Sequence, residues 1–191
     1  VVCKPSEFTS ASLLEFAKLV VEAGFPPGVF NVVTGLGNEV GEPLVRHPQV
    51  QRVAFTGGDE AGRRVYAMAA EGLKRVSLEL GGKSPNIVFD DADMDQAVHG
   101  ALSGIFSATG QTCVAGSRLL LQEGIHDAFV ERIVRLTRGA RIGDPADPAT
   151  RIGPITTRPQ YEKVVRYLEI ARSEGARCVA GRSEERRVGK E

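Results

Sequence analysis

Short apolar segments alternate with longer amphipathic segments along the first 80 residues. Apolar Val1 to Cys3 predicts a strand that stops at Pro5. A helix is expected from about Thr9, because apolar residues then recur at three- and four-residue spacing until Gly24. The same reasoning predicts strands at residues 29–33, 52–55 and 76–80, and helices at residues 38–46 and 59–70. Strands that alternate with helices imply parallel crossover units, so we expect an α/β fold with part of a doubly wound, Rossmann-like parallel sheet.

The pattern restarts after Gly81-Gly82, where we expect a domain boundary. Strands are predicted at residues 86–89, 119–121 and 176–180, and helices at residues 97–106, 125–136 and 158–173. Residues 1–80 would then belong to one domain and residues 81–182 to the start of a second α/β domain. The stretch from Ser183 to Glu191 is charge-rich and without periodicity, so we expect a loosely ordered or non-native tail.

Composition narrows the possible functions. Lys plus Arg and Asp plus Glu each number 24, so nothing favours nucleic acid or an anionic membrane surface as a partner. No apolar run is long enough to span a bilayer. The three cysteines are far apart and odd in number, which favours free thiols in a reducing compartment such as the cytoplasm. The histidines are scattered, so a metal site is not expected. Because the chain starts without Met, within an apparent strand, we expect a fragment of a longer protein.

Cys113 is the first candidate for chemistry. Small and polar residues surround it, in Gly110-Gln111-Thr112-Cys113-Val114-Ala115-Gly116-Ser117, between a predicted helix and a predicted strand. A loop at that junction exposes backbone N–H groups that can hold an oxyanion, and the thiol would be a nucleophile. The alternative is a buried structural cysteine, the usual role of a free thiol. A structural role is expected for Cys3 and Cys178.

Glu79 precedes Cys113 by 34 residues and lies in the apolar run Val76 to Leu80. A carboxylate buried there without a partner would be costly, so either strand alternation turns Glu79 to solvent or it has a function. Gly81-Gly82 would let a ligand or another chain segment approach closely, and the carboxylate would then be a general base.

Three further segments suggest ligand contacts. The turn from Gly57 to Gly62 opens a predicted helix and either binds phosphate or is a simple tight turn. The spacing from Gly35 to Gly41 is G-x-G-x-x-x-G, a weak dinucleotide signal. Lys4 and Glu7 follow a predicted strand end, where open α/β sheets bind ligands, although ordinary surface charge is the alternative.

Taken together, these segments resemble the aldehyde dehydrogenase superfamily over roughly residues 1–181. The resemblance is carried by Lys4-Pro5-Ser6-Glu7, Gly24 to Val33, Phe55-Thr56-Gly57, Leu78 to Pro85 and Gly110-Gln111-Thr112-Cys113. It implies that Cys113 is the nucleophile and Glu79 the deacylation base. It also implies a set of cofactor contacts: Lys4 and Glu7 at the adenosine ribose, then Thr56, Gly57, Gly58, Gly62, Leu80 and Gly81. The family usually has Ser where this chain has Gly58, which removes a hydroxyl. Glu7 favours NAD, with NADP possible.

By this resemblance an aldehyde is oxidised to an acid through a Cys113 thioester that a Glu79-activated water hydrolyses. The family's Asn oxyanion donor and the Glu that binds the nicotinamide ribose have no counterpart here, so we expect weak or no activity from these 191 residues alone. The full-length protein would be a homodimer or homotetramer. Two alternatives stay open: transfer of the acyl group to coenzyme A, and a non-catalytic protein that kept the fold.

Overall fold

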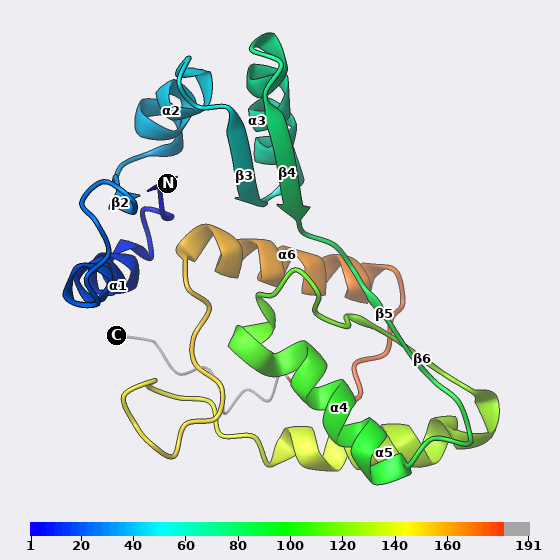
Figure 1. Cartoon of the computed structure of the whole chain (residues 1–191). Coiled ribbons are helices and arrows are strands. Elements are labelled where there is room, and N and C mark those ends of the chain that lie inside the picture. The colour runs from blue at the N-terminus through cyan, green and yellow to red at the C-terminus, as the bar shows by residue number, and fades with distance from the viewer. Residues whose placement is uncertain (182–191) are drawn as a thin grey trace. The chain divides into compact units, whose positions relative to one another are not determined.

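A computed structural model of the chain describes residues 1–181, in which helices alternate with parallel strands (Figure 1). The chain divides into two compact units, Val1–Gly81 and a unit that begins at Gly82. The predicted α/β class with parallel strands is confirmed. The predicted tail, Ser183 to Glu191, lies outside the described residues.

The first unit contains four strands that pair as two separate parallel ladders. Its elements are β1 (Val2–Cys3), α1 (Ser10–Glu22), β2 (Asn31–Val32), the π-helical turn η1 (Gly37–Gly41), α2 (Glu42–Arg46), β3 (Arg52–Gly57), α3 (Asp59–Glu71) and β4 (Arg75–Leu80). β1 pairs with β2 over two residues, whereas β3 pairs with β4 over six. No ladder joins the two pairs within the described residues, so the expected single sheet is represented by two pieces.

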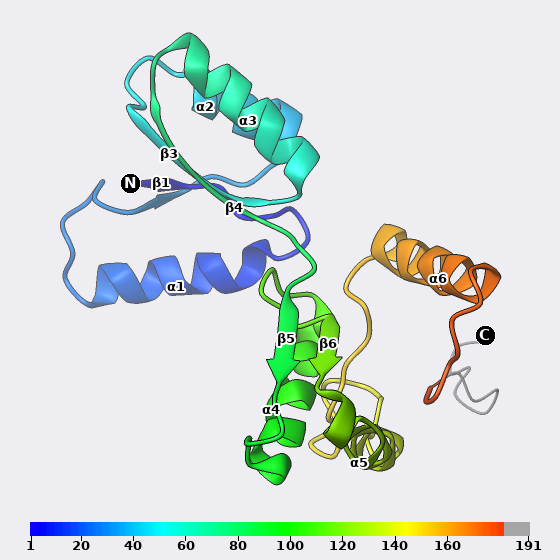
Figure 2. The ribbon, with the colours of Figure 1, turned by 90° about the vertical axis from the view of Figure 1, so that its right-hand side faces the viewer.

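Helix α3 lies along the β3–β4 ladder (Figure 2). Gly62 and Ala69 are its buried residues, and a Cβ at Gly62 would come within 2.6 Å of Leu80 Cδ2. Helix α2 is tied to α3 through an ion pair between Arg46 and Glu71. The hydrogen bond from the Arg46 guanidinium to Glu71 raises the pKa of Arg46, against a smaller lowering by desolvation. The short α2 is therefore held by α3 and not by burial alone.

The second unit contains the largest described core. Its elements are β5 (Pro85–Val88), α4 (Met94–Phe106), the 3₁₀ turn η2 (Ser107–Gly110), β6 (Arg118–Leu121), the 3₁₀ turn η3 (Glu123–Ile125), α5 (His126–Arg138) and α6 (Arg158–Ser173). β5 and β6 are parallel, and Val88, Val98, Ala101 and Phe129 form the buried cluster beneath them. Asp93 caps α4 by accepting a hydrogen bond from the backbone N–H of Gln96, so one of the acidic residues before this helix is explained.

Two predicted elements differ from the structure. The predicted strand at residues 176–180 is wrong, because the chain leaves α6 through Gly175 at φ +83° and, among residues 1–181, no strand pairs with this segment. The single helix predicted at residues 38–46 is divided. The carbonyl of Leu36 accepts from three successive N–H groups and Glu42 donates to Gly37, so a π-helical turn precedes a short α2.

Among residues 1–181, no helix is both long enough and apolar enough to cross a bilayer.

Candidate active site

Cys113 lies on an exposed turn that connects α4 to β6. Before it, η2 contains two non-glycine residues in the left-handed region, Ala108 at φ 48° and Thr109 at φ 60°, followed by Gly110 at φ 73°. Such backbone is unfavourable for residues with a Cβ, so the surrounding contacts must hold it. Cys113 is exposed, and in residues 1–181 no hydrogen bond uses its backbone N–H. The thiol and this N–H are therefore both available to a ligand.

Contacts on both sides anchor the Cys113 turn. Gln111 donates from its backbone to the Ala108 carbonyl at 3.0 Å, and its side-chain amide donates to Thr156 Oγ1 at 3.3 Å. After the thiol, the N–H of Gly116 donates to the Gly104 carbonyl in α4 at 3.1 Å. Gly116 also lies close to β5, since a Cβ there would be 3.2 Å from Asn86 Cβ. The turn is fixed at its ends, while the thiol between them stays in solvent.

Glu79 lies at the carboxyl end of the β3–β4 ladder in the first unit. The register places Thr56 opposite Glu79 and Gly57 opposite Leu80. The Glu79 and Thr56 residues are both exposed, as strand alternation allows. This pairing brings Glu79 together with three of the residues proposed along a cofactor, and Gly81 follows directly after the ladder.

The turn from Gly57 to Gly62 begins helix α3. Gly58 is the N-cap residue and makes no side-chain cap hydrogen bond, while its carbonyl accepts from the N–H of Gly62 at 2.9 Å. The N–H groups of the first turn of a helix have no intrahelical acceptor, so they are available to an anion. Asp59 and Glu60 lie in the same turn, and their carboxylates reduce the positive potential that an anion would meet.

Lys4 and Glu7 follow β1, but their environments differ. The ammonium of Lys4 is half-buried and donates to two carbonyls, Pro5 at 2.7 Å and Gly35 at 3.0 Å. Glu7 is exposed. Lys4 is thus part of a contact network, which sequence analysis did not anticipate, whereas the Glu7 carboxylate faces solvent.

The predicted site residues are distributed over both compact units. Cys113 belongs to the second unit, and all the other predicted residues belong to the first. Sequence reasoning missed Thr156, which no motif marks, and the carbonyl role of Gly35. The glycine spacing at Gly35 is the available signal, but by itself it indicates only a weak dinucleotide motif.

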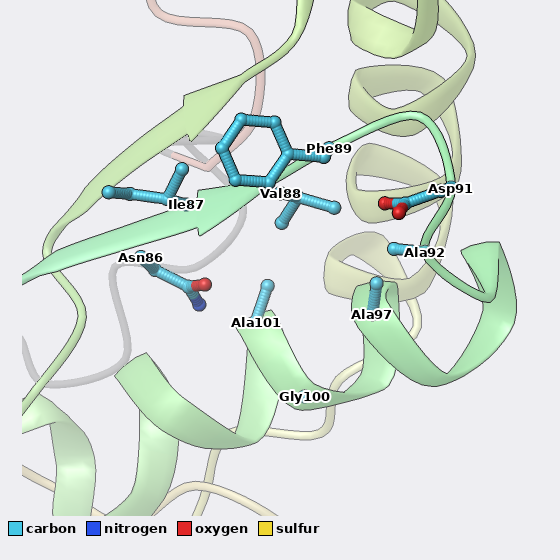
Figure 3. A pocket seen from close by; sticks show the side chains of 9 residues that line it. All are labelled: Asn86, Ile87, Val88, Phe89, Asp91, Ala92, Ala97, Gly100 and Ala101. Atoms are coloured by element: carbon cyan, nitrogen blue, oxygen red, sulfur yellow. The ribbon is translucent and has the colours of Figure 1, made fainter.

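A groove of about 450 Å³ in the second unit contains none of the predicted site residues. It lies between β5 and α4, as Figure 3 shows, with Asn86 and Val88 directed towards the helix and Ile87 and Phe89 on the other face of the strand. Val88 and Ala101 of the buried core line this groove, and Cys113 does not. Among residues 1–181, no three His, Cys, Asp or Glu side chains are grouped so that they could hold a metal ion.

Comparisons with known proteins point to one family. The model of the aldehyde dehydrogenase family matches residues 1–191. A chloroplastic betaine aldehyde dehydrogenase of Beta vulgaris is 48% identical over 182 residues, which cover 95% of this chain and 36% of that protein. A betaine aldehyde dehydrogenase of Cereibacter sphaeroides is 49% identical over 180 residues, which cover 94% of this chain and 37% of that protein. This chain therefore spans little more than a third of the length of these curated relatives.

Solved structures agree with the sequence comparison. PnpE, solved in complex with nicotinamide adenine dinucleotide, has a TM-score of 0.91 and 47% identity, covering 94% of this chain and 37% of PnpE. An Escherichia coli NADP-dependent enzyme has the same TM-score at 45% identity, with the same coverage of 94% and 37%. The chain that carries the Cys113 turn and the Glu79 strand end belongs to the aldehyde dehydrogenase family.

Proposed function

We propose that the protein oxidises an aldehyde to a carboxylic acid with NAD(P)⁺, with Cys113 as the nucleophile and Glu79 as the base. The observation that carries this proposal is the Cys113 turn: an exposed thiol, with its own N–H unused in residues 1–181, on backbone anchored at both ends. Family membership supports it. Residues 1–80 would form part of the cofactor-binding domain and residues 81–182 part of the thiol domain.

In the proposed reaction, the Cys113 thiolate forms a C–S bond to the aldehyde carbon, and the carbonyl electron pair moves to oxygen. The Cys113 N–H stabilises the resulting oxyanion. Bound NAD(P)⁺ supplies the hydride acceptor. As hydride leaves, the oxyanion collapses to a thioester on Cys113. Glu79 removes a proton from water, which attacks the thioester, and the C–S bond breaks to release the acid and the thiolate.

Several groups of the first unit fit a dinucleotide. The Lys4 ammonium has a third N–H beyond the two in its hydrogen bonds, and the Glu7 carboxylate is exposed, so both suit ribose hydroxyls. Thr56 and the α3 N-terminus provide polar backbone for the phosphates. The acidic Glu7 disfavours a 2′-phosphate, and we propose NAD as the main cofactor, with NADP also used. Related structures include one with NAD and one described as NADP-dependent.

The substrate and setting are proposed from the relatives. Betaine aldehyde and aminoaldehydes are the first substrates to test, since related proteins bear those names. We propose a cytoplasmic homodimer or homotetramer, although relatives include chloroplastic and peroxisomal proteins. The 191 residues alone are expected to be weakly active or inactive, because they span only a third of these relatives.

The test uses the full-length reading frame that encodes this chain. Cys113→Ala should abolish NADH formation from betaine aldehyde, and Cys178→Ala, at another exposed thiol, should leave it intact. Product analysis with and without coenzyme A separates the free acid from an acyl thioester, and acyl-CoA as the main product would contradict the role of Glu79. Iodoacetamide labelling is independent of turnover: a Cys113 no more reactive than Cys178 would count against an activated nucleophile and favour the non-catalytic alternative.

A further inference from the structure

The glycine-rich segment between β2 and α2 has a structural relation to Lys4 that the proposed function does not use. We propose that Gly35 and Gly41, together with the Pro5 carbonyl, form a cradle that positions the Lys4 ammonium for the cofactor. We call these three residues the Lys4 cradle. The inference rests on the proposed function, in which Lys4 contacts the adenosine ribose.

Hydrogen bonds define the orientation of the ammonium. Lys4 Nζ donates to the Gly35 carbonyl at 3.0 Å and to the Pro5 carbonyl at 2.7 Å, and both contacts are partly buried. An ammonium has three N–H groups in a fixed geometry. With two of them directed at carbonyls, the direction of the third is set by the backbone and does not depend on a flexible four-carbon stem.

The cradle requires glycine at position 35 for two independent reasons. The backbone there has φ +145°, which residues with a Cβ rarely adopt, and a Cβ would overlap the side chain of Val40. Any larger residue must move the peptide whose carbonyl accepts from Lys4. Gly35 is therefore a positioning residue that acts through Lys4.

Gly41 supports the stem of the same lysine. A Cβ at Gly41 would lie 3.6 Å from Lys4 Cδ and Cε, an ordinary van der Waals contact, so a methyl group fits there and atoms beyond Cβ would meet the aliphatic chain. Its helical backbone, at φ −66°, accepts any residue. A branched side chain at position 41 would thus crowd Lys4 without straining the local fold. Gly124, in the short helical turn η3, offers a control, because a Cβ there would have no neighbour within 4 Å.

The experiment measures NAD⁺ binding by calorimetry to the full-length protein and its variants. Lys4→Met and Gly35→Ala should each weaken binding about tenfold, the size expected for one charge-assisted hydrogen bond. Gly35→Ala should have little further effect when Lys4 is already Met. Gly124→Ala should bind like the wild type. Each affinity is also measured with an NAD⁺ analogue that lacks the adenosine ribose hydroxyls. The variants and the wild type should bind this analogue with the same affinity.

Gly41→Val keeps the test decisive if Gly35→Ala does not fold, because it should reproduce the weaker binding through the lysine stem. Additive effects of Lys4→Met and Gly35→Ala, or unchanged affinity in Gly41→Val, would overturn the cradle. The binding measurements on Lys4→Met, Gly35→Ala and the double variant form a double-mutant cycle, and urea unfolding of the same cofactor-free variants provides a second one. Coupling between positions 4 and 35 in unfolding, with no NAD⁺ or NADP⁺ binding by the wild type, would refute the cofactor role and the proposed function while leaving the contact itself intact.

Discussion

Lys4 and Cys113 each follow a regular element and are each proposed to meet a ligand, but the chain holds them in different ways. Two carbonyls bind the Lys4 side chain directly. The Cys113 side chain is exposed and has no hydrogen bond in residues 1–181, and only its backbone is anchored. The proposed binding group is thus oriented by its own contacts, whereas the proposed nucleophile is placed by the turn that carries it.

This difference has a consequence for mutagenesis. Substitutions of the exposed reacting groups should change rates and leave stability intact, because those side chains make few contacts in the folded state. Substitutions of the held lysine should change both. Each variant is made in the full-length protein.

Glu79→Gln should give the largest change. Removing the base for water should lower steady-state kcat by about 10² to 10⁴, while a first turnover of NADH is still released as a burst. The unfolding midpoint should stay at the wild-type value, because Glu79 is exposed on β4. Stopped-flow absorbance and thermal denaturation measure the two quantities. Loss of the burst would place Glu79 before thioester formation and contradict its role.

Lys4→Met should lower the free energy of unfolding by about 1–3 kcal/mol, the usual contribution of hydrogen bonds to a charged group. Methionine keeps most of the aliphatic stem, so the loss reports on the ammonium. Urea denaturation provides the measurement, and Lys18→Met is the matched control, since among residues 1–181 that lysine pairs with exposed Glu15 alone. Equal losses in both variants would remove the distinction between held and exposed groups.

Thr109→Gly tests the backbone side of the comparison. Glycine relieves the left-handed strain at φ 60° but loosens the unfolded chain, so we expect a net change in stability of at most about 1 kcal/mol. If the turn places the thiol, kcat should nevertheless fall several-fold as the turn becomes more mobile. Steady-state kinetics with denaturation measure both. An unchanged kcat would mean that the contacts of Gln111 and Gly116 suffice.

Thr156→Val should have the smallest effect. It removes the hydroxyl that accepts from the Gln111 amide, and because both residues are exposed the loss of stability should stay below about 1 kcal/mol. A modest fall in the rate of Cys113 labelling by iodoacetamide is expected. Thr156→Ser retains the hydroxyl and should label like the wild type, and equal slowing in both variants would point to packing instead.

Most elements of the fold were predictable because their signals are local. The helix at residues 158–173 was predicted at its observed bounds, and the four longer strands, β3 to β6, were located from their apolar residues. The strand at residues 176–180 failed because apolar residues form a strand only if another strand pairs with them. The helix at residues 38–46 was divided because glycines on both sides of Val40 allow a π-helical turn that periodicity does not encode.

Some parts of the proposed site follow from the sequence, and others do not. Local sequence brought Cys113, Glu79 and the glycine turn to attention, and the resemblance to a family assigned their roles. The pairing of Thr56 with Glu79 follows from a parallel register, which strand order makes plausible but does not specify. The roles of Cys113 and Glu79 stay predictions until the variants are measured.

The amino-acid sequence by itself determined the alternation of helices and strands, the α/β class and the identity of the reactive side chains. The side chains named there are candidates for reaction, and all three conclusions depend on hydrophobic periodicity and residue chemistry, which neighbours along the chain reveal. Only the tertiary structure decided two hydrogen bonds between residues distant in sequence. Gly35, 31 residues after Lys4, accepts from the Lys4 ammonium, and Thr156, 45 residues after Gln111, accepts from the Gln111 side-chain amide. Acceptors of this kind are backbone carbonyls and common hydroxyls, and they become specific only when folding brings them within hydrogen-bond distance.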